Sequence, residues 1–474
     1  MENLNYDVLK KSGYEGYILE DAPERVLQFG EGNFLRAFVD YFIDLLNEKA
    51  GFNGKAVLTQ PIAPGLSKMI NDQQGLYTLY LRGFEDGQKV NHKRVISSVS
   101  RCINPYENYA ELMDCAKNPD LRFIISNTTE AGIVYDENSA FDQTPPEGFP
   151  AKLTRFLYQR FENKLPGFII LSCELIDNNG KELEACVQKH ISQWNLGDEF
   201  AGWVKGENVF CSTLVDRIVT GYPRNEADGI NSENGYTDNL IDTAEVFGFW
   251  VIEGPQSILD EFPADKAGLP IIVTDDHTPY KQRKVRILNG SHTAMVLAAH
   301  LAGQEIVRGC MEDDAIRGYM EKAIYEEIIP TLTLPKDELM QFAASVTERY
   351  KNPFIDHRLL DIALNSASKW RARVMPSFKG YIEKFGKLPK CLTFSLGAFI
   401  AFYKKGEGVR DDQWVLDFFN SHENDSNEQL VRAVCENERM WGEDLSKIDG
   451  LVSELTENVD ALCEDAHRAI EMLV

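Results

Sequence analysis

The first half of the chain alternates short apolar runs with amphipathic segments. Apolar runs of strand length lie at 25–30, 55–61, 76–83, 94–103, 122–129 and 167–175, and helical periods lie at 34–49, 104–119 and 150–164. Strands that alternate with helices of this length form βαβ units around a mostly parallel sheet. The pattern therefore predicts an α/β N-terminal domain.

The second half has helical period almost throughout. The segments 284–303, 313–329, 336–350, 357–374 and 394–406 all repeat their apolar residues at helical spacing. The stretch 253–270, rich in proline, glycine and charge, is typical of a linker. We therefore expect an α/β domain over residues 1–276 and a mainly α-helical domain over residues 277–474.

The charge and cysteine content of the chain limit the kinds of partner and compartment that are expected. The chain has 74 acidic and 49 basic residues and a net charge of −25, which argues against nucleic acid and anionic membranes as partners. Its nine cysteines are widely spaced without a CxxC pair, so we expect reduced thiols rather than disulfides or a zinc site. With no apolar stretch of membrane length and no signal-type N-terminus, a cytoplasmic protein is expected. The oligomeric state stays open, and a monomer is compatible with the sequence.

A glycine-containing turn follows the first predicted strand. Gly30 and Gly32 stand between this strand and a helix that begins near Asn33, Phe34 and Arg36. Glycines at such a turn let the backbone approach a pyrophosphate, which binds the free N–H groups of the helix. Leucine occupies the position of the third glycine of the GxGxxG pattern, so a plain strand-to-helix turn is the alternative. The context favours a Rossmann-like, dinucleotide-binding domain.

Two strand ends bear on the cofactor. The second predicted strand ends at Gln60-Pro61, without the acid that usually binds the ribose 2′-hydroxyl and without an arginine for a 2′-phosphate. NAD is therefore favoured over NADP. The strand at 122–129 ends in polar residues at the carboxyl edge of the sheet, where contacts to nicotinamide and ribose are expected; they are Asn127, Thr128, Thr129 and Glu130.

The segment 284–294 places three polar side chains in an otherwise apolar helix pattern. On an α-helix, Lys284, Asn289 and His292 fall within about 140° of one another and can line an extended polyol or sugar acid. A lysine in a partly dry site has a lowered pKa and can act as general base, and an amide N–H can stabilise a developing oxyanion. His292 can bind a neighbouring hydroxyl or share in proton transfer. No metal is required. A solvated lysine with a core histidine is the alternative.

These residues carry a family resemblance. The K-x4-N-x2-H spacing, the early G-x-G-x-F-x-R-A, and the segments 74–79, 128–132, 214–218 and 352–353 resemble the mannitol dehydrogenase family of polyol-specific long-chain dehydrogenases. The resemblance implies NAD-dependent, metal-independent hydride transfer, with Lys284 as acid/base and Asn289 polarising the reacting oxygen. Within the family, long stretches such as 28–40 and 211–224 are most similar to members that act on sugar acids.

Two positions qualify the resemblance. Members of the mannitol type carry an asparagine as second donor where this chain has Leu175, so Asn178 or Asn179 from the following turn would have to substitute. Asp216 matches an acid of the family. It could contact a substrate hydroxyl or form a salt bridge to a base such as Arg217.

A sugar acid needs a partner for its carboxylate. The basic residues of 357–374 are the candidates: Arg358, Lys369, Arg371 and Arg373. Lys369 and Arg373 are four residues apart and share a helix face, and arginine pairs strongly with carboxylates. A solvated basic face is the alternative.

The sequence leaves three functions in competition. The leading hypothesis is an NAD-dependent oxidoreductase of a linear sugar acid. A reductase of a different sugar acid or a neutral polyol dehydrogenase is the nearest alternative. A non-catalytic NAD- or sugar-binding protein is the third, and the joint presence of Lys284, Asn289 and His292 argues against it.

Overall fold

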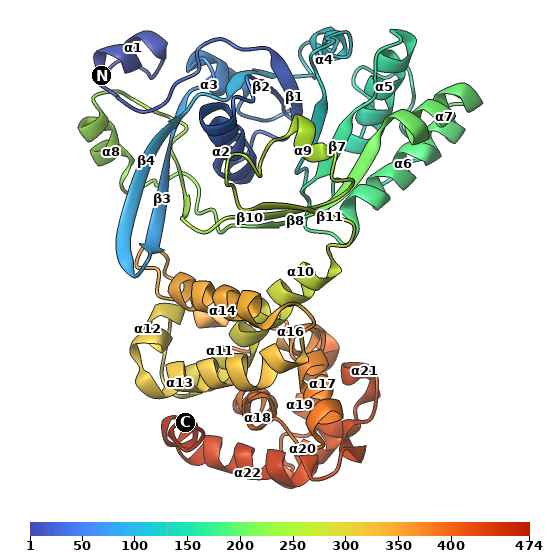
Figure 1. Ribbon diagram of the computed structural model, residues 1–474. Coiled ribbons are helices and arrows are strands. Elements are labelled where there is room, and N and C mark those ends of the chain that lie inside the picture. The colour runs from blue at the N-terminus through green and yellow to red at the C-terminus, as the bar shows by residue number, and fades with distance from the viewer. Residues whose placement is uncertain (130) are drawn as a thin grey trace. The chain divides into compact units, whose positions relative to one another are not determined.

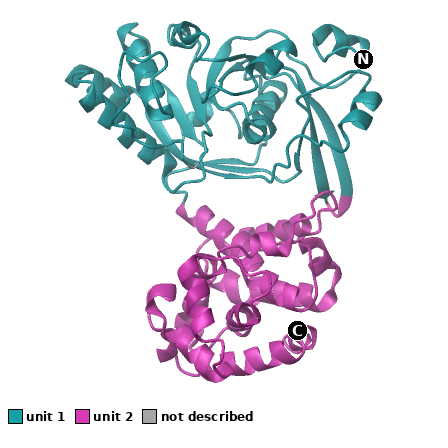
Figure 2. Cartoon of the chain, turned by 180° about the vertical axis from the view of Figure 1, so that it is seen from behind, with its two compact units in different colours: residues 1–85, 89–277 teal, residues 86–88, 278–474 magenta. Residues whose placement is uncertain are grey.

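The computed structural model describes residues 1–129 and 131–474, which form two compact units. Unit 1 comprises residues 1–85 and 89–277, and unit 2 comprises residues 86–88 and 278–474 (Figure 2). Apart from residues 86–88, the chain passes from unit 1 to unit 2 after residue 277, which is one residue beyond the predicted domain boundary. The prediction of a linker at 253–270 is wrong, because this stretch runs between two neighbouring strands of unit 1 and includes a short helix.

Unit 1 is built on an eight-stranded sheet (Figure 1). All neighbouring strands are parallel except β8 and β10, which are antiparallel. The predicted mostly parallel sheet is therefore confirmed. In spatial order the strands are β11 (Ile271–Thr274), β10 (Phe249–Glu253), β8 (Val209–Asp216), β7 (Ile169–Ser172), β6 (Phe123–Ser126), β1 (Glu24–Phe29), β2 (Lys55–Thr59) and β5 (Val99–Ile103).

A second sheet corrects two predicted strands. It has three strands in the order β4 (Gln88–Ile96), β3 (Tyr77–Glu85) and β9 (Asp242–Glu245), so the apolar run 76–83 does not join the main sheet. The run 94–103 is divided between β4 and β5. It turns at Ser97 and Ser98, whose hydroxyls donate to the carboxylate of Asp44 (3.0 Å) and the carbonyl of Asp40 (2.7 Å). The backbone N–H of Ser97 also donates to Oδ1 of Asp44 (2.9 Å) and so takes no part in a strand ladder.

Helices cover both faces of the main sheet. Alternate residues of β1 enter opposite cores: Val26 packs with Phe38 on the side of α2, and Leu27 packs with Leu153 and Phe200 on the side of α5 and α7. The helices of unit 1 are α1 (Tyr6–Lys11), α2 (Asn33–Ala50), α3 (Ser67–Asp72), α4 (Tyr109–Cys115), α5 (Phe149–Glu162), α6 (Asn179–Gln193), α7 (Asp198–Glu207), α8 (Ala227–Asn234) and α9 (Ile258–Glu261).

Unit 2 is helical, as predicted. The α18 helix is buried along most of its length, and its N-terminal N–H groups at Cys391 and Leu392 are bonded at 2.9 Å to the carboxylate of Glu327. None of the described helices is long and apolar enough to cross a membrane. The helices of unit 2 are α10 (Thr278–Arg283), η1 (Lys284–Gly290), α11 (Ser291–Leu301), α12 (Val307–Glu312), α13 (Asp314–Lys322), η2 (Ala323–Ile328), η3 (Ile329–Thr331), α14 (Lys336–Tyr350), α15 (Leu359–Ile362), α16 (Ser366–Arg373), α17 (Met375–Phe385), α18 (Lys390–Lys405), α19 (Gln413–Ser421), α20 (Asn427–Glu436), α21 (Glu438–Trp441), η4 (Leu445–Lys447), α22 (Leu451–Glu464) and α23 (Ala466–Glu471).

The buried carboxyl group of Asp40 on α2 predicts a pH-dependent stability. Burial raises its pKa to about 7, against the contrary effect of a hydrogen bond from Gln28. Because the folded-state pKa lies above the unfolded one, this group favours folding most below about pH 4, and that contribution is lost as the pH rises through about 7. We expect Asp40→Asn to remove this loss, so that a change from about pH 5 to about pH 8 in urea unfolding favours the variant by up to about 1.4 kcal/mol for each pH unit between pH 5 and the folded-state pKa of about 7. A difference between the two proteins that stays constant with pH would contradict the assignment.

Candidate active site

The turn between β1 and α2 requires glycine at Gly30. Its φ is 123°, and a Cβ there would lie 2.9 Å from the carbonyl oxygen of Asn127, at the end of the neighbouring strand β6. Gly32 is exposed at the N-cap of α2, where a Cβ would point into open space, and no side chain caps the helix. The first N–H groups of an 18-residue helix are therefore presented beside an uncrowded backbone, as phosphate binding requires.

Arg36 and Asn33 support this turn from within. The guanidinium of Arg36 is 2% exposed and donates to the carbonyl oxygens of Glu31 (3.2 Å) and Leu240 (2.7 Å) and to Oδ1 of Asn33 (2.6 Å). Because this buried guanidinium donates to two backbone carbonyl oxygens, it fixes the backbone at Glu31 and Leu240. Direct contact of these two side chains with a cofactor stays a prediction.

The carboxyl edge of the sheet is held together by a buried acid. Glu174, which follows β7, accepts hydrogen bonds at 3.0 Å from the backbone N–H and the hydroxyl of Thr128, and Asn127 donates to the carbonyl of Cys173 at 2.8 Å. Thr129, by contrast, is exposed and has a left-handed φ of 78°. Glu130, also predicted as a cofactor contact, lies outside the described residues.

Two cavities meet at this edge. One, of about 550 Å³, is lined by Phe34, Asn127, Thr129, Ala131 and Leu175, and the side chain of Leu175 is 64% exposed. The other, of about 570 Å³, extends from Thr129 and Ala131 toward the residues that follow β2. An elongated ligand with two ring systems joined by a charged linker would fit two apolar-walled cavities beside a helix N-terminus. The residues present thus fit a dinucleotide.

The predicted substrate contacts of unit 1 are buried. Asn179, 1% exposed, donates through Nδ2 to the carbonyls of Glu174 (2.9 Å) and Thr213 (3.1 Å) and accepts at 2.9 Å through Oδ1 from the N–H groups of Gly180 and Thr213. An amide has two N–H donors, and both are used, so Asn179 joins β7 to β8 and has no N–H left for a substrate. Asp216, 4% exposed, is the last residue of β8.

The segment 284–294 corrects the prediction of a regular α-helix. Residues Lys284 to Gly290 form the π-helix η1, which continues into α11 at Ser291. On an α-helix, residues five apart are separated by about 140° around the axis. In a π-helix the i→i+5 hydrogen bond widens the turn, so Lys284 and Asn289 lie on the same side of the helix and closer in angle than on an α-helix. Both are half-buried, and within the described residues the amide of Asn289 has no hydrogen-bond partner.

Tyr350 on α14 stabilises the junction of η1 and α11. Its hydroxyl donates to the carbonyl of Leu288 at 2.6 Å and lies 3.0 Å from the hydroxyl of Ser291. The carbonyl of Leu288 lies in the turn where the π-helix η1 changes to the α-helix α11, and the hydroxyl of Tyr350 supplies it with a hydrogen-bond donor. Gly290 allows α16 to approach, since a Cβ there would lie 3.0 Å from the carbonyl oxygen of Arg373.

His292 stands in an aromatic and basic setting. Its ring stacks on Tyr350 at 4.0 Å between centroids and meets His357 edge-on at 5.5 Å. Burial lowers its pKa well below the usual value, and the charges of His357, Arg349 and Arg373 add to the effect. Its Nε2 is buried and has no hydrogen-bond partner among the described residues. A neutral imidazole with an unsatisfied nitrogen can accept one hydrogen bond, and the lowered pKa disfavours a proton stored on the ring.

The basic residues predicted to bind a carboxylate differ in their surroundings. The ammonium of Lys369 donates to the carbonyl of Ile362 at 2.8 Å, and Arg358 is exposed at the N-cap of α15. Arg373 is half-buried at the end of α16, burial lowers the pKa of its guanidinium, and the described residues give it no hydrogen-bond partner. Lys369 and Arg373 share α16, as predicted, but Asn365 in a left-handed conformation separates this helix from α15.

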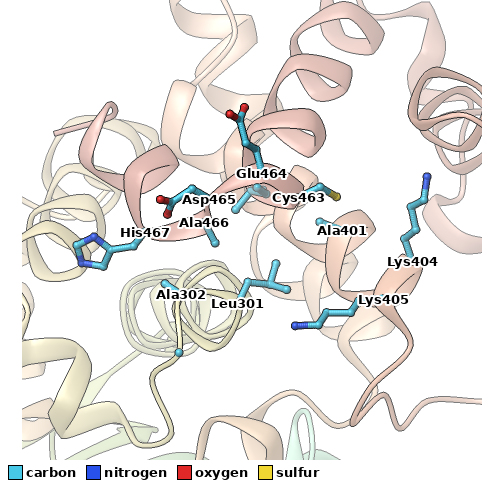
Figure 3. A pocket seen from close by; sticks show the side chains of 12 residues that line it. Leu301, Ala302, Ala401, Lys404, Lys405, Cys463, Glu464, Asp465, Ala466 and His467 are labelled. Carbon is cyan, nitrogen blue, oxygen red and sulfur yellow. The ribbon is translucent and has the colours of Figure 1, made fainter.

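A larger cavity of unit 2 is separate from these residues. It measures about 690 Å³ and lies at the C-terminal end of α11, around Leu301, Lys404, Cys463 and His467 (Figure 3). The segment from Lys284 to His292 precedes or begins α11, so the helix separates the two places. None of the predicted catalytic residues lines this cavity.

Sequence reasoning missed several residues of the site. Tyr350 and His357 contact the ring of His292 across the fold, although each lies far from it in sequence. Lys152 lines the larger cavity of unit 1 and is only 3% exposed. The nearest indication for Tyr350 was the 352–353 match beside it, and a lysine in an amphipathic helix gives no indication of its burial.

Comparison with known proteins identifies the family. The model of the mannitol dehydrogenase Rossmann domain matches residues 24–265, and that of the mannitol dehydrogenase C-terminal domain matches residues 276–463. The chain therefore belongs to the mannitol dehydrogenase family, and the resemblance drawn from the sequence is confirmed. It is an enzyme of the dehydrogenase class with a nucleotide-binding domain.

The curated relatives are more specific. The altronate oxidoreductases of Enterobacter sp. (strain 638) and Klebsiella pneumoniae (strain 342) are each 47% identical to this chain, over 94% of it and 96% of the relative in the first case and 93% and 94% in the second. Two solved structures share the fold. They are mannitol 2-dehydrogenase of Pseudomonas fluorescens with NAD and D-mannitol (TM-score 0.70, 22% identity, 99% of each chain) and a substrate-free D-sorbitol dehydrogenase (TM-score 0.81, 21% identity, 96% of each chain).

Proposed function

We propose that the protein interconverts D-altronate and D-tagaturonate with NAD and without a metal. The observation that carries the catalytic part is the π-turn of η1, which brings Lys284 and Asn289 to one side of the helix, shortly before His292 with its unsatisfied imidazole nitrogen. The sugar acid is supported by the names of the curated relatives and by the basic residues around His292.

Each of the three side chains has a separate task. Bound NAD⁺ would supply the hydride acceptor for oxidation of the carbinol carbon. In that direction the amine of Lys284 accepts the hydroxyl proton, and the N–H of Asn289 donates to the oxygen as negative charge develops on it. The neutral imidazole of His292 binds a neighbouring hydroxyl and so fixes the chain of the substrate. In reduction the same ammonium returns the proton to the oxygen.

The cofactor assignment rests on unit 1. The pyrophosphate would bind the N–H groups at the start of α2 beside Gly32, and Phe34 and Leu175 offer apolar surface for the nicotinamide. At the end of β2 the amide of Gln60 donates to the carbonyls of Ile62 (3.0 Å) and Ala63 (2.7 Å). Neither Gln60 nor Pro61 carries a positive charge for a 2′-phosphate, which supports NAD over NADP.

A substrate panel tests the proposal. The purified protein is assayed with altronate, mannonate and mannitol in oxidation, each with NAD⁺ and NADP⁺, by absorbance of the reduced nicotinamide. We expect altronate with NAD⁺ to give the highest kcat/KM. A preference for mannonate would make the protein a fructuronate reductase, a preference for mannitol would make it a polyol dehydrogenase, and no turnover with any substrate would leave only a binding protein.

A further inference from the structure

The larger cavity of unit 1 presents apolar side chains to an empty volume. Ile62 and Val134 are 58% and 57% exposed, respectively, and both line the cavity of about 570 Å³. Tyr106 forms part of the same wall, and its hydroxyl is fixed by donating to the carbonyl of Pro61 at 2.9 Å. Aliphatic groups and a fixed aromatic ring around a cavity suit a flat ring system that can be held through its faces.

A buried lysine faces this cavity. Lys152, in the first turns of α5, is 3% exposed, and no described residue accepts a hydrogen bond from its ammonium, which lies 5.2 Å from the centre of the Tyr106 ring. Burial lowers the pKa of Lys152 to about 8, against the opposing effect of Glu147, so the group is still mostly charged at neutral pH. A largely buried ammonium that lines a cavity and has no acceptor among the described residues is available to a ligand that offers one.

The charges in the cavity indicate what kind of ligand that is. Glu147 and Asp136 line the same cavity as Lys152, and Oδ1 of Asp136 accepts from the backbone N–H of Asn138 at 2.9 Å. Two carboxylates and one ammonium give this cavity a net negative charge, which disfavours a phosphate dianion. A neutral ring with a hydrogen-bond acceptor next to a donor suits this cavity, because the ammonium can donate to the acceptor and a carboxylate can accept from the donor.

We propose that this cavity binds the adenine ring of the nucleotide, with Lys152 donating to ring nitrogen N1 and a carboxylate, Glu147 or Asp136, accepting from the 6-amino group. The proposal deepens the proposed function, on which it rests, and makes Lys152 a specificity-determining residue for the base. A 6-oxopurine such as hypoxanthine has the reverse pattern, because its N1 carries a hydrogen and its 6-position is an acceptor. Both contacts would then be lost.

Binding of free mononucleotides tests this without turnover. The full-length protein is titrated calorimetrically with AMP and IMP, which carry the same ribose and phosphate. We expect AMP to bind at least about 10-fold more tightly than IMP. Lys152→Met should weaken AMP binding by about 10- to 100-fold, since hydrogen bonds to charged groups contribute about 1.5–3 kcal/mol, and should abolish the preference for AMP.

The control is Lys189→Met on α6. Lys189 also lies over a tyrosine ring, at 5.6 Å from Tyr135, but it is exposed and does not line the cavity. Its AMP affinity should equal that of the unmodified protein. Circular dichroism and thermal unfolding verify that the Lys152 variant is folded. Glu147→Gln, at an exposed position, should reduce the preference for AMP if Glu147 accepts from the 6-amino group. If Asp136 is the acceptor, Asp136→Asn should reduce that preference instead.

Two outcomes would overturn the inference. If AMP and IMP bind equally, or if Lys152→Met leaves their ratio unchanged, Lys152 does not read the base. If 2′-AMP binds more tightly than AMP and loses this advantage in Lys152→Met, the ammonium binds a 2′-phosphate instead. Either result is compatible with continued oxidation of altronate, whereas failure of the proposed function would appear as the absence of turnover in the substrate panel.

Discussion

Replacement of Lys284 by alanine is expected to lower kcat by about 10²- to 10⁴-fold, the range that a positioned acid/base contributes. Lys284 begins η1, and the π-turn brings it to the same side of the helix as Asn289. In the proposed mechanism its removal takes away the proton acceptor and leaves the amide N–H of Asn289 in place. Equilibrium binding of NADH, measured by protein fluorescence, should be unchanged because the proposed cofactor contacts are in unit 1. The effect is measured by steady-state kinetics with tagaturonate and NADH.

Two further measurements separate proton transfer from a structural effect of Lys284. A small primary amine added to the assay should restore part of the activity of Lys284→Ala, since it can occupy the vacated space and exchange the proton. Lys405→Ala, which removes an exposed lysine at the C-terminal end of α18, serves as the matched control and should retain full activity. Retention of more than about a tenth of kcat by Lys284→Ala would contradict the assignment.

The part of the fold that follows from local pattern was predictable. The runs that became β1, β2, β6 and β7 are short and apolar on both faces, as expected of strands buried between helices. The division of 94–103 between two sheets was not predictable, because it depends on hydrogen bonds from Ser97 and Ser98 to residues of α2 that are remote in sequence. The same holds for the stretch 253–270, whose prolines and glycines resemble a linker but connect neighbouring strands.

The candidate site divides in the same way. The spacing of Lys284, Asn289 and His292 was visible in the sequence, and so was its match to a family. The π-helix was not, because Asn289-Gly290 weakens a helix without specifying a π-turn, and the hydroxyl that meets the carbonyl of Leu288 comes from Tyr350 on a helix remote in sequence. For Asn179 the position near a strand end was predicted correctly but the role was not. Its amide N–H groups donate to backbone carbonyls and are not left for a substrate.

Selection for a sugar acid should depend most on Arg373. Its half-buried guanidinium lies near His292, whose pKa it helps to lower, and among the described residues it has no hydrogen-bond partner. Lys369, on the same helix, already donates to a backbone carbonyl. A guanidinium whose N–H groups are not used by the protein can bind a carboxylate through two parallel hydrogen bonds. Arg373 is therefore a stronger candidate than Lys369.

We expect Arg373→Met to raise KM for altronate by about 100-fold, because truncating one partner of a buried charge pair costs about 2–5 kcal/mol. KM for a neutral polyol such as mannitol, where it is turned over, should change much less, since that substrate has no charge to pair. Arg371→Met is the matched control: this arginine is exposed on the same helix and lies against Gly442, so it should leave both KM values unchanged. Equal increases for the acid and the polyol in Arg373→Met would mean that the side chain shapes the site as a whole, and the carboxylate would then have to be bound elsewhere.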